Sequence, residues 1–378
     1  MKIAIITFVR AYNYGAVLQC YALSQKLYQL GHDVEVIDYY PQYFYDIYTL
    51  PRIDTRIAPH RPLRKWFLNL DFHLNRRQRV KGFEDFIAKY IPITNIQFKS
   101  MKDFDNVSLD YDMYISGSDQ VWSADCVPFD PVYFLQFSNA SGKIKASYAA
   151  SFGTATIRPE LKKDYRDRLI DWNFYSVREM TGKDILHTLL DAQCTVCCDP
   201  TLLIDRKDWI SLQKPVFKNK RYVLVYTVTG NSKVLSTAKS FCNNNKTNIE
   251  IVFISGSITY STISSAKRTH SNIINYSVAS PNEWISLFFN AEYIFTDSFH
   301  GAVFSIIFHK NFKVIINNTS NSSVRIIELL ERLSLSSCIL KNNSQKTDTP
   351  INWKAIDSRL LKFKNDSFEY LNNITKEK

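Results

Sequence analysis

The chain alternates short apolar runs typical of buried strands with longer stretches in which apolar residues recur at helical spacing. Its first run, KIAIITF, leads through the turn NYG into AVLQCYALSQKLYQLG, where apolar side chains return every three or four residues. Gly31 is placed to end this predicted helix, and the strand-like run VEVIDY follows. A strand, a helix and a second strand in this order form a βαβ unit, which implies a parallel sheet.

The same alternation continues along both halves of the chain. Strand-like runs recur as YDMYIS, IKASYAA, NFYSV and CTVCCD, and later as RYVLVYTV, IEIVFIS, NIINY, AEYIFTD and FKVIIN. A polar segment that contains a proline separates the two series at 205–220. We therefore predict an α/β protein of two Rossmann-like, doubly wound domains that face a cleft. Residues 1–210 would form the first domain, 220–350 the second, and 351–378 a helix that packs back on the first.

The composition is that of a soluble protein with more than one domain. The chain has 378 residues, of which 45% are hydrophobic and 22% charged, and a single core usually stops growing at about 250–300 residues. The longest apolar runs fall short of the roughly 20 residues that a membrane span needs. The first run is not followed by a cleavage site, so we expect a cytoplasmic location.

The seven cysteines are scattered and do not suggest a disulfide framework. Cys194, Cys197 and Cys198 lie close together, but no second cysteine pair or histidine pair stands near them to complete a zinc site. Cysteine in a strand packs as a small hydrophobe. We therefore expect buried strand thiols and no metal.

Much of the net charge of +11 lies in a basic, aromatic segment at 52–81, RIDTRIAPHRPLRKWFLNLDFHLNRRQRVK. Cations mixed with aromatics suit an amphipathic helix on an anionic membrane, where each cation near the surface contributes about 1 kcal/mol. A solvated helix with its apolar side against the domain fits the same pattern, and the residues alone leave both open. Nucleic acid ranks third, because no known nucleic-acid-binding signature accompanies the charges. NAD is also poorly supported, because the first turn lacks the GxGxxG pattern.

Polar residues follow several predicted strands, at the end of a parallel sheet where ligands bind. Asp119 follows YDMYIS, and Arg178 follows NFYSV. Ser298 and His300 open a helix after AEYIF, and Arg325 lies beyond FKVIINN. Arginine binds oxyanions through two parallel hydrogen bonds, and the N-terminus of a helix attracts anions. These residues could therefore converge on one phosphate or carboxylate from both domains.

Each of these residues also has an ordinary structural explanation. Arg178 could pair only with Glu179 or Asp199, His300 could cap only its own helix, and Asp119 could cap its own turn. Spacing along the sequence does not decide between the two interpretations.

Seven blocks of the sequence resemble the polysaccharide pyruvyl transferase family. In order they are NYGAVLQCYALSQKLYQLGHDVEVIDY, YDMYISGSDQVW, SYAASFG, YSVREMTGKDIL, CDPTLLI, TDSFHGAVFSIIF and VRIIELLERLSL, which cover the chain roughly from Lys2 to Leu335. The resemblance implies a fold similar to the two-Rossmann GT-B glycosyltransferases. It also implies transfer of a pyruvyl group from phosphoenolpyruvate to sugar hydroxyls, with formation of a ketal and release of phosphate. The acceptor would be a surface polysaccharide, such as a capsule or exopolysaccharide, or its lipid-linked precursor, and no cofactor is needed.

The resemblance also implies a donor site. In the family, an arginine of a VRD or VRE block and a histidine of an RLH or SFH block belong to that site, and they match Arg178 and His300. Ser298 and Gly301 share the first turn of the same helix, where a glycine lets a ligand approach the backbone, and Arg325 is assigned by position alone. Several members carry arginine where this chain has Ser298, so another cation or backbone N–H groups must offset that loss.

Catalytic and acceptor roles follow from the resemblance too. His300 would be a phosphate ligand or the acid that protonates the enol, and Asp119 the base or the anchor of the acceptor hydroxyl. Asn13 and Tyr14, in the first loop, would face the acceptor. An acceptor carried on polyprenyl diphosphate would favour a peripheral role for 52–81 at the inner leaflet. Two alternatives are a glycosyltransferase that uses a nucleotide sugar and a non-catalytic glycan-binding protein of this fold.

Overall fold

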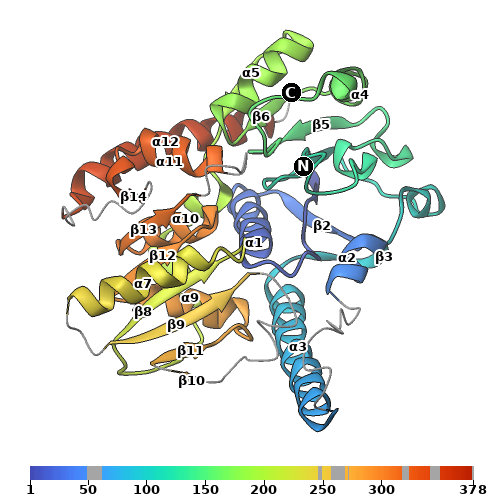
Figure 1. The fold of residues 1–378 in the computed structure, drawn as a ribbon. Coiled ribbons are helices and arrows are strands. Elements are labelled where there is room, and N and C mark those ends of the chain that lie inside the picture. The colour runs from blue at the N-terminus through green and yellow to red at the C-terminus, as the bar shows by residue number, and fades with distance from the viewer. Residues whose placement is uncertain are drawn as a thin grey trace.

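The chain folds into two α/β units, each built on a parallel sheet (Figure 1). The computed structural model describes residues 1–48, 62–245, 249–256, 269–270, 272–316, 323–340 and 350–376, with backbone only at 62–69 and 269–270. The first sheet has the strand order β3-β2-β1-β4-β5, and the second has the order β10-β11-β9-β8-β12-β13-β14. Every pairing is parallel except that of β10 with β11. The predicted fold class is confirmed.

The first sheet contains the predicted βαβ unit at its centre. Its strands are β1 (Lys2–Ile6), β2 (Asp33–Tyr39), β3 (Ile93–Phe98), β4 (Met113–Ser116) and β5 (Ile144–Ser147). Two further strands, β6 (Tyr175–Val177) and β7 (Cys194–Val196), pair in parallel with each other. Single bridges from Ala146 to Phe174 and from Ala150 to Val177 connect them to the first sheet. The carboxyl ends of β4, β5 and β6 therefore lie side by side.

The helices of this unit include the one predicted to follow the first strand and to end at Gly31. They are α1 (Tyr14–Gln29), α2 (Gln42–Tyr48), α3 (Pro62–Tyr90), α4 (Lys162–Leu169), α5 (Met180–Leu190) and α6 (Arg206–Ser211). The side chain of Asn13 accepts the Gly15 N–H at the start of α1, and Gly31 takes a positive φ of 86° just beyond its end. Cys194, Cys197 and Cys198 are buried at and after β7, as expected.

The second unit repeats the arrangement with its own strands. They are β8 (Tyr222–Thr227), β9 (Glu250–Ser255), β10 (Thr269–His270), β11 (Ile273–Asn275), β12 (Tyr293–Thr296), β13 (Asn311–Ile315) and β14 (Ile339–Leu340). Its helices are α7 (Ser232–Asn244), α9 (Pro281–Asn290), α10 (Phe299–Ile307) and α11 (Val324–Arg332). The central strands β8 and β12 are buried throughout, as parallel strands covered on both faces must be.

The last helix, α12 (Trp353–Ile374), begins against the second unit, where the His309 ring stacks on Trp353, and its C-terminal half packs on the first unit. The Tyr370 hydroxyl donates to the Ser147 carbonyl oxygen over 2.9 Å, and the Ser367 hydroxyl oxygen accepts the Cys198 N–H over 2.8 Å. Both contacts fall at the end of the first sheet near β5 and β7.

An apolar core runs without interruption from one unit to the other. Tyr14 of α1 stacks on Trp284 of α9, with ring centroids 5.4 Å apart, and both side chains are fully buried. Phe83 of α3 also packs against Tyr14, with ring centroids 5.0 Å apart. Tyr14 also donates its hydroxyl to the Ala279 carbonyl. The expectation that Tyr14 faces an acceptor is therefore wrong, because its ring is part of the interface between the units.

The basic segment at 52–81 is helical where it is described. Residues 52–61 lie outside the described part of the chain, and the remainder forms the first two thirds of α3, which reaches away from the body in Figure 1. Leu70, Leu74 and Arg77 are exposed on this helix. Arg79, in contrast, is fully buried and donates to three carbonyl oxygens of the second unit, those of Ser255, Gly256 and Ser277. Its expected role as a membrane-facing cation is wrong.

Candidate functional site

Arg178 is a buried cation at the carboxyl end of β6. Its Nη1 lies 2.9 Å from Asp199 Oδ2, its Nε lies 3.1 Å from Glu179 Oε1, and its Nη2 lies 3.9 Å from Asp119 Oδ1. Burial lowers the pKa of the guanidinium, but Glu179, Asp199 and Asp119 outweigh it and raise the pKa above its ordinary value. Arg178 therefore remains charged although only 2% of its side chain is exposed. The ordinary explanation, pairing with neighbouring carboxylates, holds for Nε and Nη1.

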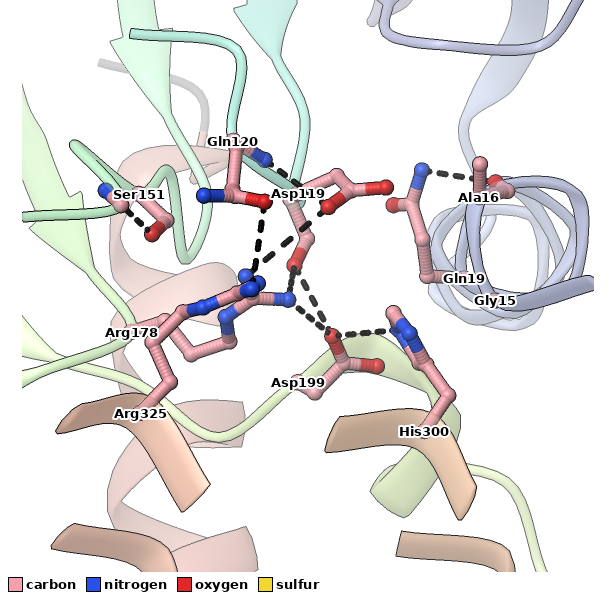
Figure 2. A network of polar contacts seen from close by, with 12 residues as sticks. Gly15, Ala16, Gln19, Asp119, Gln120, Ser151, Arg178, Asp199, His300 and Arg325 are labelled. Carbon is pink, nitrogen blue, oxygen red and sulfur yellow. Dashed lines mark hydrogen bonds and ion pairs between the residues drawn. The ribbon is translucent and has the colours of Figure 1, made fainter. Parts of the chain in front are cut away.

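Asp199 joins this arginine to the second unit. One carboxylate oxygen, Oδ2, faces Arg178 Nη1, accepts the Ser118 hydroxyl over 3.0 Å and lies 3.3 Å from His300 Nε2 (Figure 2). Burial raises the pKa of Asp199, but His300 and Arg178 outweigh it and hold the pKa well below its usual range. An ionised carboxylate thus lies between two nitrogen groups that come from different units.

His300 is held at the second position of α10 by the start of that helix. The helix begins at Ser298, whose hydroxyl oxygen accepts the Gly301 N–H over 3.3 Å. The contact between His300 Nε2 and Asp199 is not aligned as a hydrogen bond, so this buried nitrogen has no hydrogen-bond partner among the described residues. The ring is therefore oriented by its surroundings, and its Nε2 faces Asp199 Oδ2.

Gly15 packs directly against the His300 ring. A Cβ atom built at Gly15 would overlap Nδ1, Cγ and Cε1 of His300. The first turns of α1 and α10 can therefore meet only if residue 15 has no side chain. The sequence offered only a weak signal for this role, because Asn-Tyr-Gly is also an ordinary turn.

Arg325 brings a second guanidinium to the same place. It lies at the start of α11, where its Nη2 donates to Gln120 Oε1 over 3.1 Å. The ring of Phe299 lies near both guanidinium groups, with its centroid 4.4 Å from Arg178 Cζ and 5.8 Å from Arg325 Cζ. Burial lowers the pKa of Arg325, and the neighbouring Arg178 lowers it further. Two cations so close together are typical of a site for an anion.

Three buried nitrogens in this cluster have no hydrogen-bond partner within the described part of the chain: Arg178 Nη2, His300 Nε2 and Arg325 Nε. Buried donors are nearly always satisfied in folded proteins, so three in one cluster call for a missing partner. Figure 2 shows the side chains converging from both units around Asp199. The arrangement can bind an anion with several acceptor oxygens.

Other predicted site residues take different places. Asp119 stands beside Arg178 with a positive φ of 82°, and its carboxylate accepts the N–H of Gln120 over 2.9 Å, so it both caps its own turn and borders the cluster. Asn13 caps α1 through Gly15.

Gly301 is held by contacts within its own unit. Its N–H is already bound to Ser298, and a Cβ atom at this position would overlap Thr296 Oγ1. The lack of a side chain at 301 therefore serves packing on β12, and the approach of a ligand to this backbone stays a prediction.

The described residues contain neither a metal-binding cluster nor a membrane-spanning helix. No group of three or more histidine, cysteine, aspartate or glutamate side chains there could hold a metal ion. None of the described helices combines the length and the apolar character needed to cross a membrane.

A family model, described as polysaccharide pyruvyl transferase, matches residues 13–319. The chain belongs to this family. Membership implies that the protein is a pyruvyl transferase that acts on a polysaccharide sugar. Both Arg178 and His300 lie within the matched range, whereas Arg325 lies beyond it.

Solved structures with similar folds come from other enzyme families. One is a putative UDP-N-acetylglucosamine 2-epimerase from Listeria monocytogenes, with 11% identity, a TM-score of 0.45, and coverage of 98% of this chain and 90% of that chain. Another is UGT89C1 of Arabidopsis thaliana in complex with UDP-L-rhamnose, with 11% identity, a TM-score of 0.47, and coverage of 98% and 97%. These likenesses concern the fold and do not identify a substrate for the pyruvyl transferase. No curated protein sequence matches the chain.

Proposed function

We propose that this pyruvyl transferase takes the pyruvyl group from phosphoenolpyruvate and attaches it as a ketal to hydroxyls of a sugar in a surface polysaccharide or its lipid-linked precursor. The observation that carries the proposal is the cluster of three unpartnered nitrogens on Arg178, His300 and Arg325. Each of these nitrogens is buried, and together they come from both units of the fold. A ligand with two anionic groups would satisfy them.

The charge of phosphoenolpyruvate fits this cluster. A phosphate monoester carries about −1.5 to −2 charge at pH 7, and the carboxylate adds to it. Arg178 and Arg325 supply two guanidinium groups, each able to bind an oxyanion through parallel hydrogen bonds. Ser298 stands where several family members carry arginine, and Arg325, with its open Nε, is the cation that we propose in its place.

The reaction needs a proton at the terminal carbon and loss of a proton from the attacking hydroxyl. In our proposal, His300 donates a proton from Nε2, which lies 3.3 Å from Asp199 Oδ2, to the terminal carbon, and C2 becomes an oxocarbenium-like centre. A sugar hydroxyl then adds to C2 and gives its proton to Asp119, the C2–O bond to phosphate breaks, and the second hydroxyl closes the ketal with loss of its own proton. The two guanidinium groups stabilise the departing phosphate.

In this proposal, the two units bind different substrates. Residues 1–210 would bind the acceptor, with Asn13 and Asp119 at its edge, and 220–350 would supply most of the donor site. Arg178 is the exception, because it belongs to the first unit and yet lies with the donor residues.

A thermal-shift assay with phosphoenolpyruvate tests whether this compound is the donor that the protein binds. We expect the ligand to raise the melting temperature of the wild type and to have no effect on Arg178→Ala or His300→Ala, because each variant loses one of the unpartnered donors. Arg168→Ala is the matched control. Its guanidinium also lies over a phenylalanine, 4.0 Å from the Phe129 centroid, but away from the cluster, so the shift should survive.

Other outcomes of the same experiment identify the alternatives. A shift with a nucleoside diphosphate sugar and none with phosphoenolpyruvate would indicate a glycosyltransferase. A shift with phosphoenolpyruvate but no phosphate release with any acceptor would indicate a binding protein.

We also propose that part of 52–81 holds the enzyme at the inner leaflet, where a polyprenyl-diphosphate-linked acceptor would be found. Because Arg79 is buried, the variant to test neutralises Arg61, Arg64, Lys65 and Arg77 and leaves Arg79 in place. We expect this variant to float with anionic liposomes less than the wild type does, since each cation near such a surface contributes about 1 kcal/mol. Equal recovery of the two proteins would refute the membrane role.

A further inference from the structure

We propose that Asp199 is a positioning residue, which holds the imidazole of His300 and the guanidinium of Arg178 in the relative arrangement that the donor needs. The inference rests on the proposed function, because it gives Asp199 a task in the binding of phosphoenolpyruvate. Asp199 is fully buried and would act through its two neighbours, without touching the ligand itself.

The two carboxylate oxygens of Asp199 have separate tasks. Oδ1 accepts the N–H of Thr201 over 3.0 Å and its hydroxyl over 2.6 Å, which fixes the carboxylate to the short helix η5 (Pro200–Leu202). Oδ2 is then aimed at Arg178 Nη1 and Ser118 Oγ, with His300 Nε2 3.3 Å away. A carboxylate tied down on one side can set where its neighbours stand on the other.

The contact between Asp199 and His300 also joins the two units. Asp199 belongs to the first unit and His300 to α10 of the second, and the backbone of Gly15 closes the opposite side of the imidazole ring. The ring is therefore held between α1 and the Asp199 carboxylate.

Because Asp199 is negatively charged, it cannot help to bind the anionic donor by attraction, and its contribution must come from the positions of its neighbours. A buried carboxylate beside an anion site repels the anion, so on charge alone Asp199 would weaken donor binding. The pKa of Asp199 is held well below its usual range by His300 and Arg178, so the carboxylate remains ionised. Its benefit must therefore lie in the orientation of the groups that do bind.

Asp199→Asn tests this separation of charge from geometry. Because two Thr201 donors already occupy Oδ1, the new amide nitrogen would take the place of Oδ2 and face the N–H of Arg178 Nη1, a group that cannot accept a hydrogen bond. The guanidinium would be pushed away from its position, whereas the Ser118 hydroxyl can turn and accept.

Calorimetric titration with phosphoenolpyruvate and with inorganic phosphate gives the readout. Phosphoenolpyruvate has two anionic groups at a fixed separation, whereas phosphate can bind to one displaced cation. We expect the preference for phosphoenolpyruvate over phosphate to fall by about tenfold or more in Asp199→Asn, while the affinity for phosphate itself does not weaken. If Asp199 had only a structural role, the substitution would lower the affinities for both ligands together or would change neither.

Asp130→Asn is the matched control. Asp130 is a buried aspartate that accepts the hydroxyls of Tyr39 and Tyr43 away from the cluster, so its variant should lose stability and keep the wild-type preference. If Asp199→Asn does not fold, Thr201→Val and Ser118→Ala carry the test, since each removes one hydrogen bond that fixes the carboxylate. We expect a fall in preference of about threefold in each, a smaller loss of the same kind.

An unchanged preference in Asp199→Asn, or in both milder variants where that protein does not fold, would overturn the inference. So would a parallel loss of affinity for the two ligands. A wild type that does not bind phosphoenolpyruvate would refute the proposed function, and the inference with it. Binding by the wild type with no change in the variants would refute the positioning role alone.

Discussion

Replacement of Gly15 by alanine is expected to reduce sharply the effect of phosphoenolpyruvate on the melting temperature while leaving the fold almost as stable as before. The new methyl group would overlap the imidazole of His300, and the ring can move away more easily than the backbone of α1 can. Alanine also favours a helix over glycine by about 1 kcal/mol, which offsets part of the cost of the overlap. The donor site would therefore lose its geometry before the protein loses its structure.

The expected loss of affinity in Gly15→Ala depends on how far the His300 ring is displaced. A shift of about 1 Å at a binding group can cost on the order of 10²-fold, so we expect the affinity for phosphoenolpyruvate, measured by calorimetry, to fall at least tenfold. Gly82→Ala is the matched control, because its Cβ would lie 2.8 Å from Ser280 Cβ in another helix contact that is remote from His300. That variant should melt at a lower temperature and still respond to the ligand. A normal response from Gly15→Ala would show that the ring position is not needed for binding.

Local patterns predicted the strands and helices that bear the site, because each depends on neighbours in the sequence. The βαβ unit at the N-terminus and the start of α10 at Ser298 are examples. The placement of Arg178 and His300 at ends of strands followed from the same patterns and from the rule for parallel sheets. What the sequence left open was whether the two residues meet.

The contacts across the two units could not be predicted in the same way. Gly15 and His300 are far apart in the sequence, and nothing local marks them as neighbours. Tyr14 was expected to face the acceptor because it was placed in the first loop, whereas it begins α1 and its ring packs in the core against Trp284. Asp199 was considered only as an alternative partner of Arg178, because its second neighbour comes from the other unit. Such contacts depend on how whole domains pack.

Arg79 shows most clearly that composition predicts a basic segment but not which way each basic side chain points. A run of cations indicates a basic surface, but one residue of the run points inwards and is fully buried. Its guanidinium lies 5.0 Å from the centroid of Tyr14 and 5.7 Å from that of Phe83, and it donates to carbonyls that follow or end β9 and β11. This side chain fixes α3 to the second unit.

We therefore expect Arg79→Ala to lower the free energy of unfolding by about 3–5 kcal/mol, because a buried side chain that makes three hydrogen bonds is removed. The carbonyls of Ser255, Gly256 and Ser277 would each lose a donor, and the space of a long side chain would be left unfilled. Urea denaturation measures the change.

Arg77→Ala is the natural comparison, because Arg77 lies on the same helix and is exposed, so its replacement should stay within about 0.5 kcal/mol of the wild type. Arg79→Lys should fall between the two, since one ammonium group keeps the charge but cannot reach three carbonyls with the geometry of a planar fork. Equal midpoints for Arg79→Ala and Arg77→Ala would mean that α3 is held to the second unit by its apolar contacts alone. A large difference, with the response to phosphoenolpyruvate retained in the folded fraction, would separate the residue that joins the units from those that bind the donor.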